Sequence, residues 1–167
     1  MPYHKIPHWT PEHGLEVLTF GLGSETFALE AAIVREILDM MPVTAVPGAD
    51  PMAGAVINFR GRIVPLADLR GSFGMEGQGA TADSRIIVIE LDLDGTPVLI
   101  GLTADRVNEV TVLDARDTEE APTIGMRWPR DHVRCLVRRD GDVIVLPDLF
   151  SLFARLTASA AEPGSLH

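Results

Sequence analysis

Two arginines, Arg60 and Arg62, flank a glycine inside the run VINFRGRIVPLADLR, which spans 56–70. A guanidinium on such a turn can form charge-assisted hydrogen bonds with a carboxylate or a carbonyl oxygen of a partner. Charged residues at a hairpin tip are also commonly just solvated, because loops are their default location. The sequence around the turn therefore leaves two interpretations open: a solvated tip, or a charged contact beside an apolar surface.

Catalytic chemistry would require further residues at defined spacings. The chain has no Gly-x-Ser-x-Gly motif, no histidine pair on a helix face and no Cys-x-x-Cys pair. Asp68 and Asp148 each precede an expected helix start, where a carboxylate satisfies free backbone amides. His132, in a polar loop, is the one remaining acid–base candidate in the globular part. We therefore expect a protein that is not an enzyme and that needs no cofactor.

Cysteine and histidine give no strong metal signal. Cys135 is the only cysteine and lies in the alternating run VRCLVRR, which predicts a buried, unreactive thiol and excludes an intramolecular disulfide. His4, His8 and His13 lie in a proline-rich N-terminal arm, where Pro7 prevents the first two from sharing a helix face. A flexible arm is the simpler interpretation than a metal site.

Charge and hydropathy restrict the class of partner. The formal net charge is −10 over 167 residues, which argues against nucleic acid and against an anionic membrane surface. We find no signal peptide and no apolar stretch near the roughly 20 residues of a membrane span. We expect a soluble, cytoplasmic protein without direct membrane insertion. Because aromatic residues make up only 5% of the chain, the core must consist mainly of Val, Ile and Leu.

Hydrophobic periodicity and turn residues predict a chain made mostly of strands. Asp94-Gly95 and Asp140-Gly141 are the strongest hairpin signals, and Gly61 supplies the positive φ of a third turn. The expected strands lie at 15–22, 26–29, 43–46, 56–59, 63–66, 85–93, within 96–107, and at 110–113, 133–139 and 143–147. Helical segments are expected at 30–38, where Val34, Ile37 and Leu38 fall on one apolar side, within 51–55, from 67–70 onward, at 105–109 (helix or turn) and after Asp148. A loop is expected at 114–132.

An internal repeat divides the chain. The segment 27–37 aligns with 100–110, and the segment 63–69 aligns with 143–149 at a slightly larger offset. Each repeat contains about five short strands, which close most naturally into a small barrel without exposed edges. We therefore expect a mainly β fold of two five-stranded barrels in tandem, related by a pseudo-two-fold axis and carrying short helices.

Four segments together resemble the CheW-like domain family. The run INFRGRIVPLADLR resembles the family signature, and FALEAAIVREIL is similar to its first helix. IGLTADRVNEV is similar to the motif of its second half, and GDVIVLPDLFSLF resembles its last strand and helix. The resemblance implies an arm at 1–14, a CheW-like domain at 15–154 and a tail at 155–167. Within the domain, the first repeat covers about 15–75 and the second about 85–154.

The resemblance implies two SH3-like barrels and a non-catalytic adaptor in a chemosensory array. Its expected partners are the regulatory domain of the histidine kinase CheA and the cytoplasmic tips of chemoreceptors. The receptor-binding residues that the resemblance implies are Asn58, Arg60, Val34 and Glu36, and the kinase-binding residues are Leu18, Ala31 and Val34. Leu18 and Ala31 are expected on the barrel surface that faces the kinase.

Some features depart from the family pattern. Ala55 stands where the family commonly has glycine, and the arm with Trp9 and the loop with Trp128 have no counterpart that we can name. They leave open whether the output is swimming chemotaxis or another chemosensory response. A small-molecule-binding sensor on the same fold is the alternative function, and it would require an apolar pocket.

Overall fold

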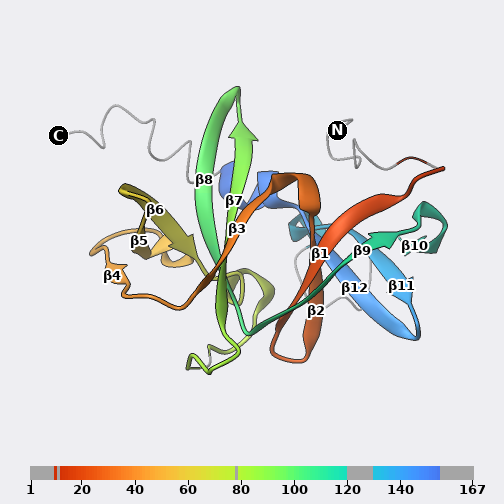
Figure 1. Cartoon of the computed structure of the whole chain (residues 1–167), viewed down its shortest axis with the longest axis horizontal. Coiled ribbons are helices and arrows are strands. Elements are labelled where there is room, and N and C mark those ends of the chain that lie inside the picture. The colour runs from red at the N-terminus through yellow and green to blue at the C-terminus, as the bar shows by residue number, and fades with distance from the viewer. Residues whose placement is uncertain (1–9, 11, 78, 120–129, 155–167) are drawn as a thin grey trace.

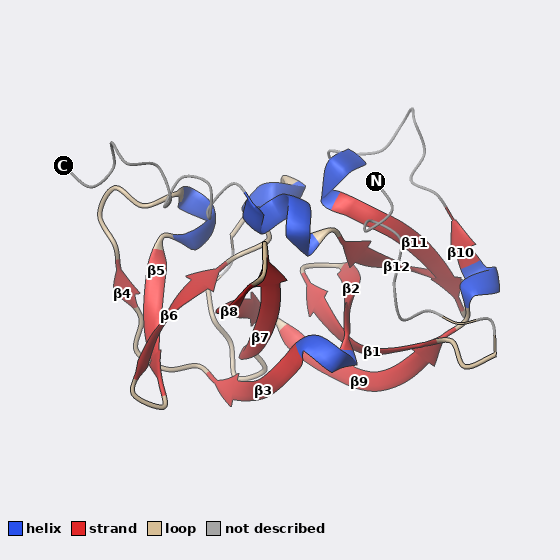
Figure 2. Ribbon diagram, turned by 90° about the horizontal axis from the view of Figure 1, so that it is seen from above, coloured by secondary structure: helices blue, strands red, loops and turns tan. Residues whose placement is uncertain are grey.

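The computed structural model describes residues 10, 12–77, 79–119 and 130–154, and these form a mainly β protein with two six-stranded sheets (Figures 1 and 2). The sheet that we call the first barrel contains β3 (Val34–Asp39), β7 (Arg85–Leu93), β8 (Thr96–Ala104), β6 (Arg62–Ala67), β5 (Ala55–Phe59) and β4 (Thr44–Ala45), in that order. The second barrel contains β10 (Thr118–Glu119), β11 (Val133–Arg139), β12 (Asp142–Pro147), β2 (Glu25–Glu30), β1 (Leu15–Leu22) and β9 (Arg106–Leu113). Each barrel therefore has five longer strands and one two-residue edge strand.

The repeat in the sequence is also a repeat in space. Read from its two-residue strand, each sheet has the same order, and β4, β5, β6, β8, β7 and β3 correspond to β10, β11, β12, β2, β1 and β9. The one parallel junction falls at the same place in both, between β6 and β8 and between β12 and β2. A hydrogen bond is repeated too: Asp68 N–H donates to the Met52 carbonyl at 3.2 Å, and Asp148 N–H to the His132 carbonyl at 2.8 Å.

The expectation of one barrel per repeat is wrong, because the repeats exchange their first hairpins. The hairpin β1–β2 belongs to the first repeat but pairs with β9 and β12 of the second. Likewise β7–β8 belongs to the second repeat but pairs with β3 and β6 of the first. Neither barrel is therefore complete without strands from both halves of the chain.

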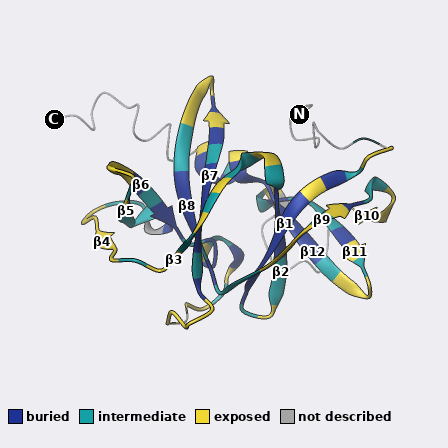
Figure 3. Cartoon of the chain, in the orientation of Figure 1, coloured by how far each residue is buried: buried dark blue, intermediate teal, exposed yellow. Residues whose placement is uncertain are grey.

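Three apolar clusters follow from this exchange. One cluster fills the first barrel around Ile57, Val64 and Ile86, and another fills the second around Val17 and Val137. The largest lies between the barrels, where the exchanged hairpins contribute most of the residues: Leu18, Phe20, Leu22, Phe27, Leu29, Ile87, Ile89, Leu91, Leu93, Ile100, Leu102 and Ala104. Strand β7 faces its own barrel core on one side and the central cluster on the other, which explains its burial on both faces (Figure 3).

The helical segments correct several expectations. The segment 30–38 is not a helix: only the 3-10 helix η2 (Ala31–Ile33) is helical, and β3 follows it. The segment 106–109 belongs to β9 rather than to a helix or turn, and 67–70 leads into the 3-10 helix η4 (Gly71–Phe73) instead of starting an α-helix. The helical turn within 51–55 is confirmed as η3 (Pro51–Ala53), and residues 149–154 are α-helical as expected.

Within the expected loop at 114–132, the described residues form η5 (Ala115–Asp117), β10 and η6 (Arg130–His132). The remainder of that loop with Trp128, most of the arm with His4, His8 and Trp9, and the tail 155–167 lie outside the described residues. Within the described residues, none of the helices has the length and apolar character needed to cross a bilayer.

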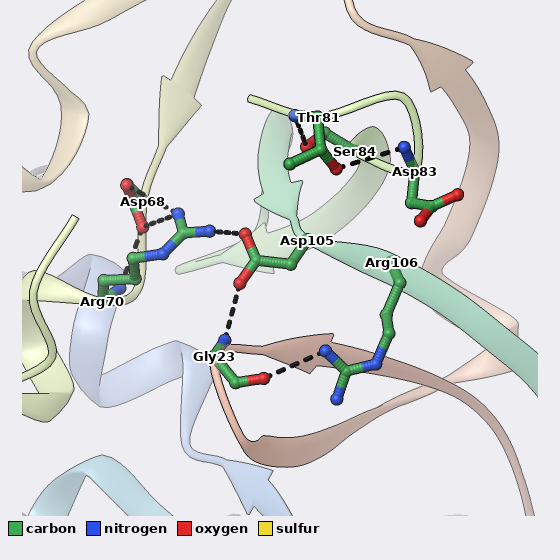
Figure 4. Close-up of polar contacts among 8 residues, drawn as sticks. All are labelled: Gly23, Asp68, Arg70, Thr81, Asp83, Ser84, Asp105 and Arg106. Carbon is green, nitrogen blue, oxygen red and sulfur yellow. Dashed lines mark hydrogen bonds and ion pairs between the residues drawn. The ribbon is translucent and has the colours of Figure 1, made fainter. Parts of the chain in front are cut away.

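The chain passes from one barrel to the other at two crossovers, and one of them is held by charges. At the crossover between β8 and β9, Asp105 Oδ2 accepts a hydrogen bond from the Gly23 N–H at 2.6 Å (Figure 4). The buried guanidinium of Arg70 joins Asp105 to Asp68, with an Nη1–Oδ2 distance of 3.0 Å to the latter. Arg106 Nη1 donates to the Gly23 carbonyl at 3.0 Å. We call Arg70, Asp105 and Gly23 the crossover latch, because they join both barrels.

Candidate recognition surface

The turn that carries the two arginines is a tight hairpin between β5 and β6. Arg60 and Gly61 both have positive φ, 52° and 79°, so the two central residues are left-handed as in a type I′ turn. Asn58 Oδ1 accepts a hydrogen bond from the Gly61 N–H at 3.0 Å, which stabilises the turn. The expected positive φ of Gly61 is thus confirmed. Ala55 lies within β5 outside the left-handed region, so it does not disturb the turn.

Arg60 extends from this turn toward the opposite edge of the same sheet. Its guanidinium forms an ion pair with Glu36 of β3 and lies 5.2 Å from the centroid of the Phe59 ring. Because β3 and β4–β5 stand at opposite ends of the strand order, this contact requires the sheet to curl closed. The Arg60 side chain is nevertheless 72% exposed. The structure therefore brings together three of the residues that the resemblance implies, Asn58, Arg60 and Glu36.

The other implied residues have different environments. Val34, at the start of β3, is half-buried and packs against the central cluster, and Ala31 is half-buried in η2. Leu18 is only 3% exposed and belongs to the central cluster. The expectation that Leu18 lies on the barrel surface is therefore wrong, because β1 belongs to a hairpin that packs between the barrels. Its side chain belongs to the same central cluster against which Val34 packs.

Sequence reasoning missed three exposed apolar residues on the edge strands β3 and β9, among them Val112 of β9, which is 54% exposed. Ile37 of β3 is 42% exposed and Val110 of β9 is 60% exposed. The two align with each other in the repeat, so they occupy equivalent places in the two barrels. The strands β3 and β9 lie on the same face of the molecule, with η2 beside them (Figures 1 and 2). The repeat could have indicated them, because it aligns Ile37 with a residue of an expected strand. The prediction of a helix at 30–38 instead placed Ile37 on its buried side.

An arginine–glutamate pair also lies next to the equivalent turn of the second barrel, between the end of β11 and the edge strand β9. Arg139 Nη1 lies 3.6 Å from the Glu109 carboxylate of β9, and Glu109 corresponds to Glu36. Arg139 also donates to Thr111 Oγ1 at 2.6 Å, and its side chain is 35% exposed. Its guanidinium is therefore held against the barrel, whereas that of Arg60 is presented to solvent.

Groups that could support catalysis are engaged in other contacts. His132 Nδ1 is 2.8 Å from the Ser72 carbonyl oxygen, and its ring meets Phe73 edge-on at 6.0 Å. His132 and three aspartates line a cavity of about 840 Å³. The His132 ring is engaged there by the hydrogen bond to the Ser72 carbonyl. Burial raises the pKa of the Cys135 thiol to about 11, with a small opposing effect from Arg134. Among the described residues, no three histidine, cysteine or acidic side chains gather to hold a metal ion.

Comparisons with known proteins agree with this architecture. The family "CheW-like domain" matches residues 16–157. The chemotaxis protein CheW of Rhizobium meliloti is 30% identical over 148 residues, covering 89% of this chain and 93% of that protein. Protein PilI of Pseudomonas aeruginosa is 34% identical over 88 residues, covering 53% of this chain and 47% of that protein.

A solved structure has the same fold. The scaffolding protein TtCheW from Thermoanaerobacter tengcongensis superposes with a TM-score of 0.73 at 29% identity, covering 84% of this chain and 92% of that one. The expected mainly β fold of SH3-like barrels is thereby confirmed. Since the family match extends over nearly all of the two barrels, the chain belongs to the CheW-like domain family.

Proposed function

We propose that this chain is a non-catalytic adaptor that couples chemoreceptors to the histidine kinase CheA in a bacterial chemosensory array. The supporting observation is the exposed Arg60–Glu36 pair, which lies on the first barrel at the same edge strand as the exposed Ile37. A charged pair beside an apolar edge is suited to bind another protein. In this proposal the chain is cytoplasmic and is recruited to receptor arrays at the membrane.

The receptor contact in this proposal uses Asn58, Arg60, Glu36 and Val34. A receptor tip is a helical hairpin, and a helix docks with apolar side chains against an apolar groove and with a few polar contacts for register. Ile37 and Val110 supply exposed apolar surface on the two edge strands. Arg60 can exchange Glu36 for a receptor carboxylate or a helix C-terminal carbonyl, because the guanidinium is largely solvated.

The kinase contact in this proposal is with the regulatory domain of CheA, and it uses Ala31 and Val34. Both residues are half-buried at the crossover where the chain leaves β2 and enters β3. Leu18 acts there as packing beneath the surface, since its side chain is inaccessible. The residues of the two proposed contacts meet at Val34, so one segment can transmit a change from receptor to kinase.

The test compares charge reversal at Arg60 with charge reversal at Arg62, which is exposed in the same hairpin. Loss of a central charged contact costs about 2 kcal/mol, or roughly 30-fold in affinity. We expect Arg60→Glu to abolish receptor-stimulated phosphorylation by CheA in reconstituted arrays, and Arg62→Glu to retain at least half of it. Thermal unfolding of both variants checks that the fold is intact.

The outcomes distinguish a failure of the role proposed for Arg60 from a failure of the adaptor function itself. If Arg60→Glu stimulates the kinase normally, Arg60 has no part in coupling. If the unaltered chain fails to retain the CheA regulatory domain in a pull-down, and also fails to bind receptors, the adaptor role itself is wrong.

A further inference from the structure

The second crossover, between β2 and β3, differs from the latched one at equivalent positions. When the two repeats are aligned, Phe150 takes the place of Arg70 and Ala32 takes the place of Asp105. The charged pair of one crossover is therefore replaced by an aromatic ring and a methyl group in the other. In place of the latch, this crossover contains a pocket of about 370 Å³.

The pocket has apolar walls from both barrels and five charged residues in its lining. Apolar side chains from β2, η2, β7, β8 and the last helix surround it: Leu29, Ile33, Leu91, Pro97, Leu149 and Phe150. The charged residues are Glu30, Arg35, Glu90, Asp92 and Arg134. Arg35 pairs with Glu90, and Asp92 is exposed to solvent. The buried charges are therefore Glu30 and Arg134 of β11, whose side chain is 12% exposed. A volume of this size lies in the range of small-molecule sites, and it holds roughly ten to fifteen non-hydrogen atoms at ordinary packing density.

Arg134 is paired on one side only. Its Nη1 donates to Glu30 Oε1 at 2.8 Å. Its Nε and Nη2 are buried and have no hydrogen-bond acceptor within the part of the chain that the structure describes. Buried donors of a charged group are rarely left unsatisfied, because their desolvation is then uncompensated. By contrast, the equivalent crossover satisfies Arg70 with two carboxylates.

The geometry of the two unsatisfied nitrogens determines which kind of acceptor they can bind. In a guanidinium, the Nε–H and one Nη–H point the same way and form a planar fork that matches the two oxygens of a carboxylate. Glu30 already occupies the other side of Arg134, so a singly charged anion fits this site better than a doubly charged phosphate. Arg35 also lines the pocket, but it pairs with Glu90 at 3.5 Å, so the fork of Arg134 is the positive group left for an anion.

We propose that this pocket binds a small free organic carboxylate with an apolar body, held by the Nε–Nη2 fork of Arg134. The apolar body occupies the space between Leu91, Leu149 and Phe150. Because the two nitrogens have almost no accessible surface, the guanidinium turns toward the pocket on binding while Nη1 keeps Glu30. The site is independent of the adaptor function, although Ile33 and Arg35 in its lining flank Val34.

The test uses three probes of one size and shape: 3-phenylpropionate, 3-phenylpropionamide and 3-phenylpropylamine. The full chain is titrated with each, and methyl and amide chemical shifts are followed by NMR. We expect 3-phenylpropionate to saturate with a Kd of about 1 mM or below, with shifts at Leu91 and Leu149. The amide should bind at least tenfold more weakly, and the amine should not bind measurably.

Variants connect binding to Arg134. Arg134→Gln should weaken carboxylate binding at least tenfold, and Glu30→Gln/Arg134→Gln should do the same if the single variant does not fold. Arg138→Gln, on the same strand but paired with Glu119 outside the pocket, should change the Kd by less than twofold. The proposal is overturned if no probe saturates at 10 mM, if the amine binds as tightly as the carboxylate, or if both Arg134 variants bind like the unaltered chain.

Discussion

The turns at 60–61 and 140–141 occupy equivalent places in the two barrels, yet the arginines near them differ in how far they are exposed to solvent. Both have positive φ at both central residues, and in both barrels an arginine reaches the glutamate of the opposite edge strand. Arg60 does so from the turn itself, and its side chain stays largely exposed. Arg139 does so from the end of a strand, where Thr111 holds it as well. The shared contact closes each barrel. The arginine stands one residue earlier in the second barrel than in the first, and this difference in position decides whether its guanidinium is available to a partner.

The two crossovers show the same division between shared scaffold and local difference. One is joined by the crossover latch, in which Arg70 and Asp105 are mostly buried. The other has Ala32 and Phe150 at the corresponding positions and leaves an apolar pocket. A duplicated scaffold thus has one crossover held by ions and one held by apolar packing.

The largest effect is expected from Asp105→Ala, which leaves Arg70 buried with Asp68 as its remaining ionic partner among the described residues and removes the acceptor of the Gly23 N–H. Removal of one partner of a buried pair costs about 3 kcal/mol or more. The free energy of unfolding, measured by denaturant titration, should fall by that amount.

Two controls define the origin of that loss. Asp39→Ala removes the partner of Arg85 from an exposed pair, with a separation of 3.5 Å, and should cost no more than about 0.5 kcal/mol. Arg70→Met/Asp105→Ala should recover part of the stability, because it removes the uncompensated buried charge. Equal stability of the Asp105 and Asp39 variants would contradict the latch.

Much of the local structure was predictable from the sequence, because it depends on neighbouring residues. Alternating Val, Ile and Leu located β7, β8, β11 and β12, and the Asp-Gly pairs located two hairpins. The segment 30–38 misled because Val34, Ile37 and Leu38 also fit a helical spacing. In the structure a bulge between Val34 and Glu36 shifts the pairing with β7, and alternation of burial along β3 is the true pattern.

The site was only partly predictable, because its contacts are non-local. The Asn-Phe-Arg-Gly run indicated where a charge would be displayed, but nothing in its spacing predicted that Arg60 meets Glu36 across a closed sheet. The hairpin exchange depends on two parallel junctions between distant strands, which no local pattern encodes. Leu18 was misplaced for the same reason, since the exchange buries its side chain between the barrels.

A second prediction tests the part of the turns that the barrels share. Gly61 and Gly141 have φ of 79° and 84°, and an added Cβ would meet no atom within 4 Å at either position. Alanine at each should therefore cost only the backbone strain of the left-handed region, about 1–2 kcal/mol. We expect equal losses in Gly61→Ala and Gly141→Ala by thermal unfolding. A clear difference between the two would show that the turns are not equivalent supports.

A third prediction tests how the turns differ. Arg139→Ala removes the hydrogen bond to Thr111 together with an ion pair in which the arginine is 35% and the glutamate 60% exposed, and it should cost about 1 kcal/mol, mainly through the hydrogen bond. Arg60→Ala removes a mostly solvated pair and should cost about 0.5 kcal/mol or less. Denaturation of both variants side by side measures the difference. If Arg60→Ala were the more destabilising change, Arg60 would be a structural residue rather than a displayed one.

The smallest effect concerns Cys135, which takes the place of Ala55 in the second barrel: Cys135 pairs with Leu146 as Ala55 pairs with Leu66. Burial raises the pKa of its thiol to about 11, so at pH 8 the native chain holds far less thiolate than a free cysteine would. Alkylation by iodoacetamide should be slower than in the urea-unfolded chain by roughly a hundredfold.

The same shift makes stability depend on pH. Between about pH 8.5 and 11 the unfolded chain loses the thiol proton while the folded chain retains it, so the free energy of unfolding falls as pH rises through that range. Cys135→Ala, which copies the residue of the first barrel, should lose less stability from pH 8 to pH 10 than the unaltered chain. An identical decline in both, or rapid alkylation of the native protein, would show that the thiol is not shielded from water in the folded chain.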